Sequence, residues 1–176
     1  GQKGLAIRYL YEELKPGIDP LGPENKLLFT TGPLTGTGVP CSGKLSIASK
    51  SPATGTICDC SIGGHSANSI KYAGYDMVIL EGRAPNPTII VIDNDKVTLE
   101  KAGELWGKGS HETERILHER LGGEFEHLLI GPAGENLVPM ACINSDYYRQ
   151  AGRGGMGAVM GSKNVKAICV RGTGKV

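Results

Sequence analysis

The segment from Leu128 to Gly157 reads LLIGPAGENLVPMACINSDYYRQAGRGGMG, and the order of its features decides the fold. An apolar pair, Leu128-Leu129, leads into Gly131-Pro132, and the glycine pair Gly154-Gly155 then opens a short helical stretch. A strand-like run follows and ends at Gly172. Apolar runs that alternate with glycine turns over so short a distance are typical of a sheet with tight connections.

The first half of the chain repeats this order. Leu27-Leu28 leads into Gly32-Pro33, the pair Gly63-Gly64 opens a short helix, and the next strand-like run ends at Gly82. The two Gly-Pro dipeptides are 99 residues apart. A single long offset indicates a duplication with insertions, because solenoids need at least about three shorter units. A duplicated fold with two equivalent glycine loops would suit a ligand that is itself two-fold.

Hydrophobic patterning predicts a sheet-dominated α+β fold over a single domain, residues 1–176. Helices are predicted over residues 3–14, 64–72, 110–121 (with Ser110 as the N-cap) and 155–161. Strands are predicted over residues 26–31, 44–48, 55–60, 75–80, 88–92, 96–100, 127–130, 140–143 and 165–170. We therefore expect two packed β-sheets with a few short helices and an internal pseudo-two-fold duplication.

The composition narrows the class of protein. Lysine plus arginine number 19 against 18 acidic residues, so generic nucleic-acid binding is not expected. No apolar run approaches the roughly 18 to 20 residues of a membrane helix, and we expect a soluble protein without a membrane partner. Five cysteines, an odd number in a chain of this size, indicate reduced thiols and a cytoplasmic location. Because the chain starts at Gly1 without an initiating Met, we expect a fragment.

The densest cluster of unusual residues runs from Tyr148 to Gly157. Two guanidinium groups, Arg149 and Arg153, flank a glycine-rich backbone whose N–H groups can face an anion at a helix start. This pattern predicts a phosphate site. The first-half counterpart is divided among GPLTGTG (32–38), SGK (42–44) and SIGG (61–64), where tight turns are an equally good interpretation of Gly36 and Gly38.

Two nucleotide-binding motifs are matched only superficially. Gly152, Gly154 and Gly157 fit G-x-G-x-x-G, but no apolar strand precedes them and no acid follows about 20 residues later. Residues 103–110 resemble a P-loop but have three residues where four are needed before Gly107-Lys108. We reject both interpretations.

The remaining chemical groups give weak signals. Cys58 and Cys60, with Cys41, lack the spacing of a metal site. Cys58 and Cys60 would share one face of their strand and are interpreted as core thiols. Of the four scattered histidines, only His65 lies beside a glycine loop. No nucleophile with an adjacent base and no paired carboxylates are recognisable. We assign no catalytic residue and expect the domain alone to be inactive.

Six segments, in order over nearly the whole chain, carry a resemblance to a known family. They are DPLGPENKL (19–27), GPLTGT (32–37), KSP (50–52), KYAGYD (71–76), GPAGENL (131–137) and residues 149–166. Together they resemble the N-terminal domain of the aldehyde ferredoxin oxidoreductases. Long matches spaced in order are far more specific than any single glycine motif.

The resemblance implies a cofactor and its contacts. In that family two β-sheets form a base under a tungsten (or molybdenum) bis-pterin, whose two phosphates are bridged by magnesium. It implies phosphate contacts for Lys44 and Arg149, and main-chain carbonyls of Ser61 and Gln150 that face the magnesium. The predicted cofactor-binding residues are Lys44, Ser61, Gly63, Gly64, Arg149, Gln150, Gly152 and Arg153.

Two positions depart from the family's pattern. Lys44 stands where the family has an arginine, and it keeps the charge but lacks the planar, bidentate fork. Ser61 stands where the family often has asparagine, a change of little consequence if only the main-chain carbonyl is used. Gly63 and Gly152 match family positions that contact the cofactor.

The resemblance also implies an activity. Aldehydes would be oxidised to carboxylates, and two electrons would leave through a [4Fe-4S] cluster to a ferredoxin-type acceptor. The family's cluster cysteines and substrate-side residues lie in later domains. The alternatives are a relative acting on a hydroxycarboxylate or an aromatic acyl thioester, and a stand-alone module that binds a phosphorylated small molecule. The oligomeric state, including a homo-oligomer, is left open.

Overall fold

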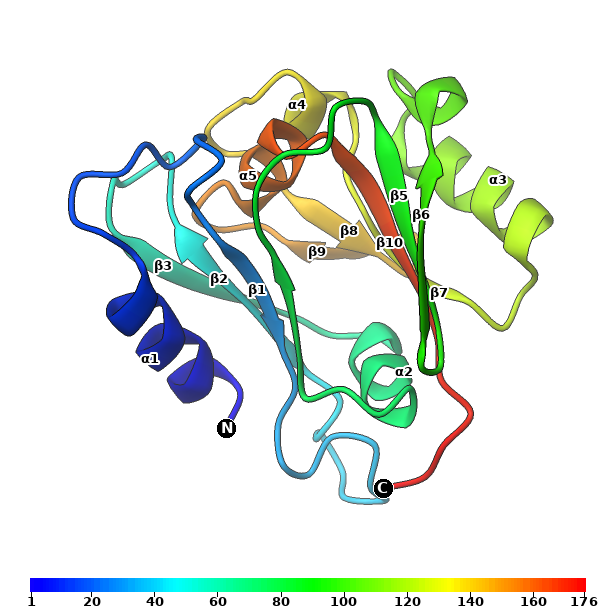
Figure 1. The fold of residues 1–176 in the computed structure, drawn as a ribbon. Helices are drawn as coiled ribbons and strands as arrows, with labels where there is room; N and C mark the ends of the chain where they lie inside the picture. Colours follow the sequence, from blue (N-terminus) through cyan, green and yellow to red (C-terminus); the bar gives the residue numbers. More distant parts are fainter.

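In the computed structural model, which describes residues 1–176, two β-sheets pack face to face (Figure 1). The first sheet has the order β3-β2-β1-β4 and the second the order β6-β5-β10-β7-β8-β9. The first sheet consists of β1 (Leu27–Thr30), β2 (Leu45–Lys50), β3 (Ile57–Ile62) and β4 (Met77–Leu80). The second consists of β5 (Thr88–Asp93), β6 (Lys96–Lys101), β7 (Glu126–Leu129), β8 (Ile143–Ser145), β9 (Arg149–Ala151) and β10 (Val165–Arg171).

The predicted duplication is present in the topology of the two sheets. The order β3-β2-β1-β4 in the first sheet corresponds to β9-β8-β7-β10 in the second, and all neighbours in both sets are antiparallel. The β5–β6 hairpin has no counterpart and extends the second sheet, with β5 parallel to β10. The repeated order of features in the sequence therefore corresponds to a repeated four-stranded unit.

Short helices surround the sheets, and none is long and apolar enough to cross a bilayer. They are α1 (Lys3–Glu13), α2 (Ser66–Tyr72), the 3-10 turn η1 (Gly103–Leu105), α3 (Ser110–Leu121), α4 (Pro132–Glu135) and α5 (Met156–Ser162). Leu10 of α1 packs on Leu28 at the outer face of the first sheet. Leu117 of α3 packs on Leu129 at the outer face of the second.

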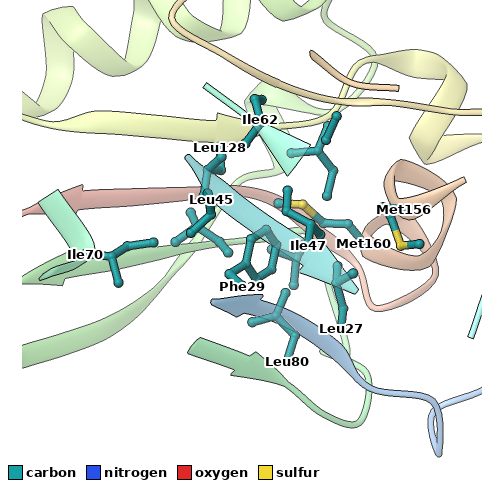
Figure 2. Packing of buried hydrophobic residues seen from close by; sticks show 14 of the residues in the cluster. Leu27, Phe29, Leu45, Ile47, Ile62, Ile70, Leu80, Leu128, Met156 and Met160 are labelled. Carbon is teal, nitrogen blue, oxygen red and sulfur yellow. The ribbon is translucent and has the colours of Figure 1, made fainter. Parts of the chain in front are cut away.

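The main core lies between the sheets, and strand periodicity decides which residues reach it. Leu27 and Phe29 point into this core, whereas Leu28 between them points out to α1. Figure 2 shows Phe29 among the aliphatic side chains of the first sheet, with Met156 and Met160 of α5 close by. Five of these side chains are fully buried, namely Leu27, Leu28, Phe29, Met156 and Met160. Both glycine-pair helices, α2 and α5, contribute to this same core.

The predictions missed two short elements and misplaced two boundaries. Strand β9 and helix α4 were not predicted, because three and four residues are too few to show a period. Strand β8 begins at Ile143 rather than at residue 140. The N-cap of α3 is Gly109, and Ser110 is the first helical residue. The other predicted helices and strands are confirmed to within a few residues of their ends.

Candidate cofactor-binding site

Strands β3 and β9, which hold equivalent positions in the duplicated unit, lie side by side at the surface. An ideal Cβ on Gly154 would lie 2.8 Å from Cys58 Sγ of β3. The main chain of Arg153 lies close to the sulfur of Cys60, also on β3. The loop after β9 therefore runs along the edge of β3, and the two glycine loops meet.

The glycine pair of the first loop contacts the second-half hairpin directly. An ideal Cβ on Gly63 would lie 3.8 Å from Arg149 Nη1. Gly64 has φ +104°, and a Cβ there would lie 1.9 Å from Asp146 Oδ2, so only glycine fits this position. The pairing of Leu45 with Ile62, continued by one residue, places Lys44 opposite Gly63. Lys44 and Arg149 thus belong to one surface rather than to opposite sides of the molecule.

The cations of this surface have no acidic partners. Lys44, Arg149 and Arg153 are all exposed. None of them takes part in an ion pair of the structure. Three free positive charges beside bare glycine backbone form a surface that can bind a dianion such as a phosphate group.

Ser61 and Gln150 occupy equivalent positions in the two edge strands. Ser61 is the penultimate residue of β3 and Gln150 the penultimate residue of β9, and both are exposed. Their strands are paired on one side only, to β2 and β8 respectively. Main-chain groups on the open side of an edge strand lack a partner within the sheet, so they are available to a ligand. The role of these carbonyls in binding magnesium stays a prediction.

The remaining predicted residues lie in the same two loops. Gly152 follows β9 directly, is exposed, and would carry a Cβ 3.8 Å from Cys142 Sγ. The structure therefore brings all eight sequence-predicted site residues onto one surface, where their contact with a cofactor stays a prediction.

The glycine loop of residues 32–38 is held in place by hydrogen bonds within the first half of the chain. Thr35 Oγ1 accepts a hydrogen bond from the Gly32 N–H and donates one to the Ser42 carbonyl. Gly36 has φ +83° and its carbonyl accepts a hydrogen bond from the Tyr72 hydroxyl, which favours the tight-turn interpretation.

A cleft of about 290 Å³ lies between this loop and Lys44. The largest groove, about 710 Å³, lies beside β4 and the β5–β6 hairpin, away from the predicted residues.

Sequence reasoning missed a cluster of polar groups behind the first glycine loop. The sequence showed no paired carboxylates, but in the structure a carboxylate oxygen of Glu126 lies within 4.8 Å of one of Asp146. Burial, together with the neighbouring Asp146 carboxyl, raises the pKa of Glu126 to about 7. His65 Nδ1 lies 3.5 Å from Asp146 Oδ2. The three residues come from separate elements, so no spacing in the sequence could have revealed them.

Of the two cysteines predicted to be core thiols, Cys60 is buried in the core between the sheets and Cys58 is partly buried against it, whereas Cys41 is exposed. Burial raises the pKa of the Cys60 thiol to about 12, and burial raises the pKa of Cys169 as well. Thiolate, the form that binds metals, is therefore disfavoured at both positions. All five cysteines are free.

Comparison with known proteins identifies the family. The model of the aldehyde ferredoxin oxidoreductase, N-terminal domain, matches residues 1–172, so the chain belongs to this family. The tungsten-containing aldehyde ferredoxin oxidoreductases of Pyrococcus horikoshii and Pyrococcus furiosus are both 48% identical to it, over 100% and 98% of the chain. The chain spans 29% of the length of each of these relatives.

A solved structure has the same fold. The active-site complex BamBC of benzoyl coenzyme A reductase, determined with 1,5-dienoyl-CoA, superposes with a TM-score of 0.97 at 38% identity. The match covers 100% of this chain and 27% of that one. A glyceraldehyde-3-phosphate:ferredoxin oxidoreductase of Pyrococcus furiosus is 30% identical over 88% of the chain and 28% of its own length. The predicted family and the α+β fold are thus confirmed.

Proposed function

We propose that this chain is the N-terminal cradle of a tungsten bis-pterin in an enzyme that oxidises aldehydes to carboxylic acids. Family membership supports the type of cofactor, since the relatives at 46–48% identity are named tungsten-containing enzymes. Their names also favour an aldehyde over an aromatic acyl thioester, because the benzoyl coenzyme A reductase complex is more distant, at 38% identity. Molybdenum is the alternative metal.

The residues present fit such a group. Its two phosphates require two positive regions, and the duplicated loops supply Lys44 from the first half and Arg149 from the second. The side-chain-free backbone at Gly63 lies next to the Arg149 guanidinium, which leaves room for a ligand to approach both. The single observation that carries the proposal is this meeting of two glycine loops with three unpaired cations.

Each residue then has a defined part. Lys44 and Arg149 bind one phosphate each, and Arg153 adds charge beside the second. The main-chain carbonyls of Ser61 and Gln150, as equivalent atoms of two equivalent strands, would hold the magnesium ion. Gly63, Gly64 and Gly152 offer main-chain contact without steric hindrance. When bound, the cofactor supplies two-electron redox chemistry at its metal, and this chain orients it.

The rest of the reaction lies outside these 176 residues. A [4Fe-4S] cluster held by other domains would carry the electrons to a ferredoxin, in the cytoplasm of an anaerobic cell. Ferredoxin as the partner is supported by the names of the relatives. A homo-oligomer is compatible with this arrangement, since the predicted site uses residues of one chain only.

Arg149→Ala in the full-length protein tests the proposal. We expect the tungsten and pterin content per protein to fall several-fold, because a charge-assisted phosphate contact contributes about 1.5–3 kcal/mol. Arg115→Ala is the matched control, since Arg115 is an equally exposed arginine on α3 that pairs only with Glu119. Elemental analysis and the mass of the released pterin provide the measurement. Equal tungsten content in both variants would remove Arg149 from the site.

A further inference from the structure

We propose that His65, Glu126 and Asp146 form a binding site for a divalent transition-metal ion, of which Zn²⁺ is the best fit. One imidazole nitrogen and two carboxylate oxygens, one ligand atom from each residue, all lie within 4.8 Å of one another. This site uses side chains and is separate from the main-chain carbonyls of Ser61 and Gln150. It rests on the geometry of these three residues and not on the proposed cofactor function.

The fold brings the three ligands together from distant parts of the chain. His65 is the N-cap residue of α2, Glu126 is the first residue of β7, and Asp146 begins the turn between β8 and β9. Asp146 is held in place on both sides, because its Oδ2 accepts the His65 N–H at 3.1 Å and its Oδ1 accepts the Ser145 hydroxyl at 3.2 Å. The adjacent Tyr147 N–H donates to buried Glu114 at 2.8 Å. Asp146 is therefore positioned by the structure before any metal binds.

The charges of the cluster are not balanced within the protein. Two partly buried carboxyl groups lie within 4.8 Å of each other, and neither is paired with a lysine or an arginine. Two other acids that are buried or partly buried do have such partners: Glu135 pairs with Lys166, and Asp93 with Arg171. Carboxylates in contact repel each other unless a proton or a cation lies between them. Among the nearby histidines, His65 is the one with a ring nitrogen within 4.8 Å of both carboxylates, and an imidazole nitrogen is itself a metal ligand.

The donor set selects the class of ion. One nitrogen and two carboxylate oxygens suit Zn²⁺, Mn²⁺ or Fe²⁺, whereas Mg²⁺ prefers oxygen alone. The His65 side chain is 74% exposed, so an ion can enter from solvent and a fourth position stays open to water. Because Asp146 packs against Gly64, an ion held here would also brace the glycine turn next to Arg149.

Equilibrium dialysis of the full-length protein against micromolar Zn²⁺, with elemental analysis of both compartments, tests the site. The variants are His65→Ala and Glu126→Gln, and the matched control is His111→Ala, an exposed histidine beside the same hairpin but outside the cluster. We expect wild type and control to bind one more Zn²⁺ per chain than either variant. We also expect each variant to weaken binding at that site by more than about tenfold.

Zinc binding that is equal in wild type, His65→Ala and Glu126→Gln would overturn the proposal. The proposal would also be overturned if the wild-type protein bound no Zn²⁺ at this site. Thermal unfolding of each variant shows that a loss of zinc does not come from misfolding, and the exposed His65→Ala change keeps the test decisive if Glu126→Gln is unstable. Tungsten content, measured on the same samples, reports separately on the proposed cofactor function.

Discussion

The two glycine-pair units share one order of features but have different places in the fold. In the second unit every residue of α5 is buried, and the following strand β10 lies inside its sheet. In the first unit α2 buries only three residues, and β4 is an edge strand. A Cβ on Gly155 would meet the Pro139 carbonyl oxygen at 2.0 Å, and one on Gly157 would meet the Cys142 oxygen at 2.3 Å.

This difference shows that equivalent glycines in a duplicated chain need not have equivalent roles. In the second half, glycine permits backbone to pack on backbone, and α5 becomes a rigid support for the Arg149–Gly155 loop. Across from it, Gly63 faces only the end of a flexible arginine side chain and leaves open space. We therefore expect substitutions of the tightly packed glycines Gly155 and Gly157 to act on stability, and a substitution of Gly63 to act on ligand binding.

The largest effect is expected from Lys166→Met, which breaks the buried ion pair behind the second unit. Lys166 on β10 and Glu135 on α4 are both almost fully buried, so removing the cation strands a carboxylate. We expect a loss of about 3–5 kcal/mol in the free energy of unfolding, measured by urea denaturation. Arg115→Ala, which removes an exposed pair, should cost less than about 1 kcal/mol. Similar losses in both variants would mean that burial does not distinguish the two pairs.

The second largest effect is expected from Gly157→Ala, which tests how tightly α5 packs against the main chain beside it. A methyl group would overlap the main chain at Ala141 and Cys142, which cannot move without shifting β8. We expect a destabilisation of at least about 1–3 kcal/mol, seen as a lower midpoint in thermal unfolding. A variant as stable as wild type would show that the helix can shift, and that the second unit is no more rigid than the first.

Lys163 gives a pH-dependent test of how the second unit is fastened to the first half. Its Nζ donates to the main-chain carbonyls of Asn25 and Gly82, and burial lowers its pKa from 10.5 to about 8. Between these pH values the native chain has lost a proton that the unfolded chain keeps, so stability attributable to Lys163 rises with pH. Relative to Lys163→Met, wild type should gain on the order of 1–3 kcal/mol from pH 8 to 10.5. If the free energies of unfolding of wild type and Lys163→Met changed in parallel between pH 8 and 10.5, the lowered pKa of Lys163 would be contradicted.

The smallest effect is expected from Gly38→Ala in the first half. No atom lies within 4 Å of the added Cβ, and the residue does not need a positive φ. Restricting the unfolded chain should then stabilise the protein by about 0.4–1 kcal/mol. Urea denaturation beside Gly157→Ala makes the comparison direct. A destabilised Gly38→Ala variant would mean that this loop is as tightly constrained as α5.

Local pattern predicted most of the fold, and its failures have a physical cause. Strands such as β5 are long enough to show their period, and the duplication was visible because Gly-Pro and Gly-Gly pairs mark equivalent turns. Strand β9 was missed because its three residues include exposed Arg149 and Gln150 and pair only with a neighbouring short strand. Its position depends on hairpin pairing, which leaves no hydrophobic period.

The candidate site was predictable only in part. The two loops could be found because glycines and cations are clustered in the sequence, and the resemblance supplied their roles. The contact between Glu126 and Asp146 could not be found, since it forms only when β7 and the β8–β9 hairpin pack beside α2. Such contacts are set by tertiary structure, which neither spacing nor composition reveals.

Strands β3 and β9 lie side by side but belong to different sheets and are not paired with each other, which affects how this surface can change in evolution. If the two edge strands were paired, the two sheets would form one continuous sheet, and the main-chain amides and carbonyls on their facing edges would be hydrogen-bonded to each other. Because they stay apart, recognition can rely on peptide groups that every amino acid carries. If the Ser61 and Gln150 carbonyls bind the ligand as we propose, a substitution such as the serine at position 61 leaves the binding atom in place, and the side chains there can change while the ligand stays the same.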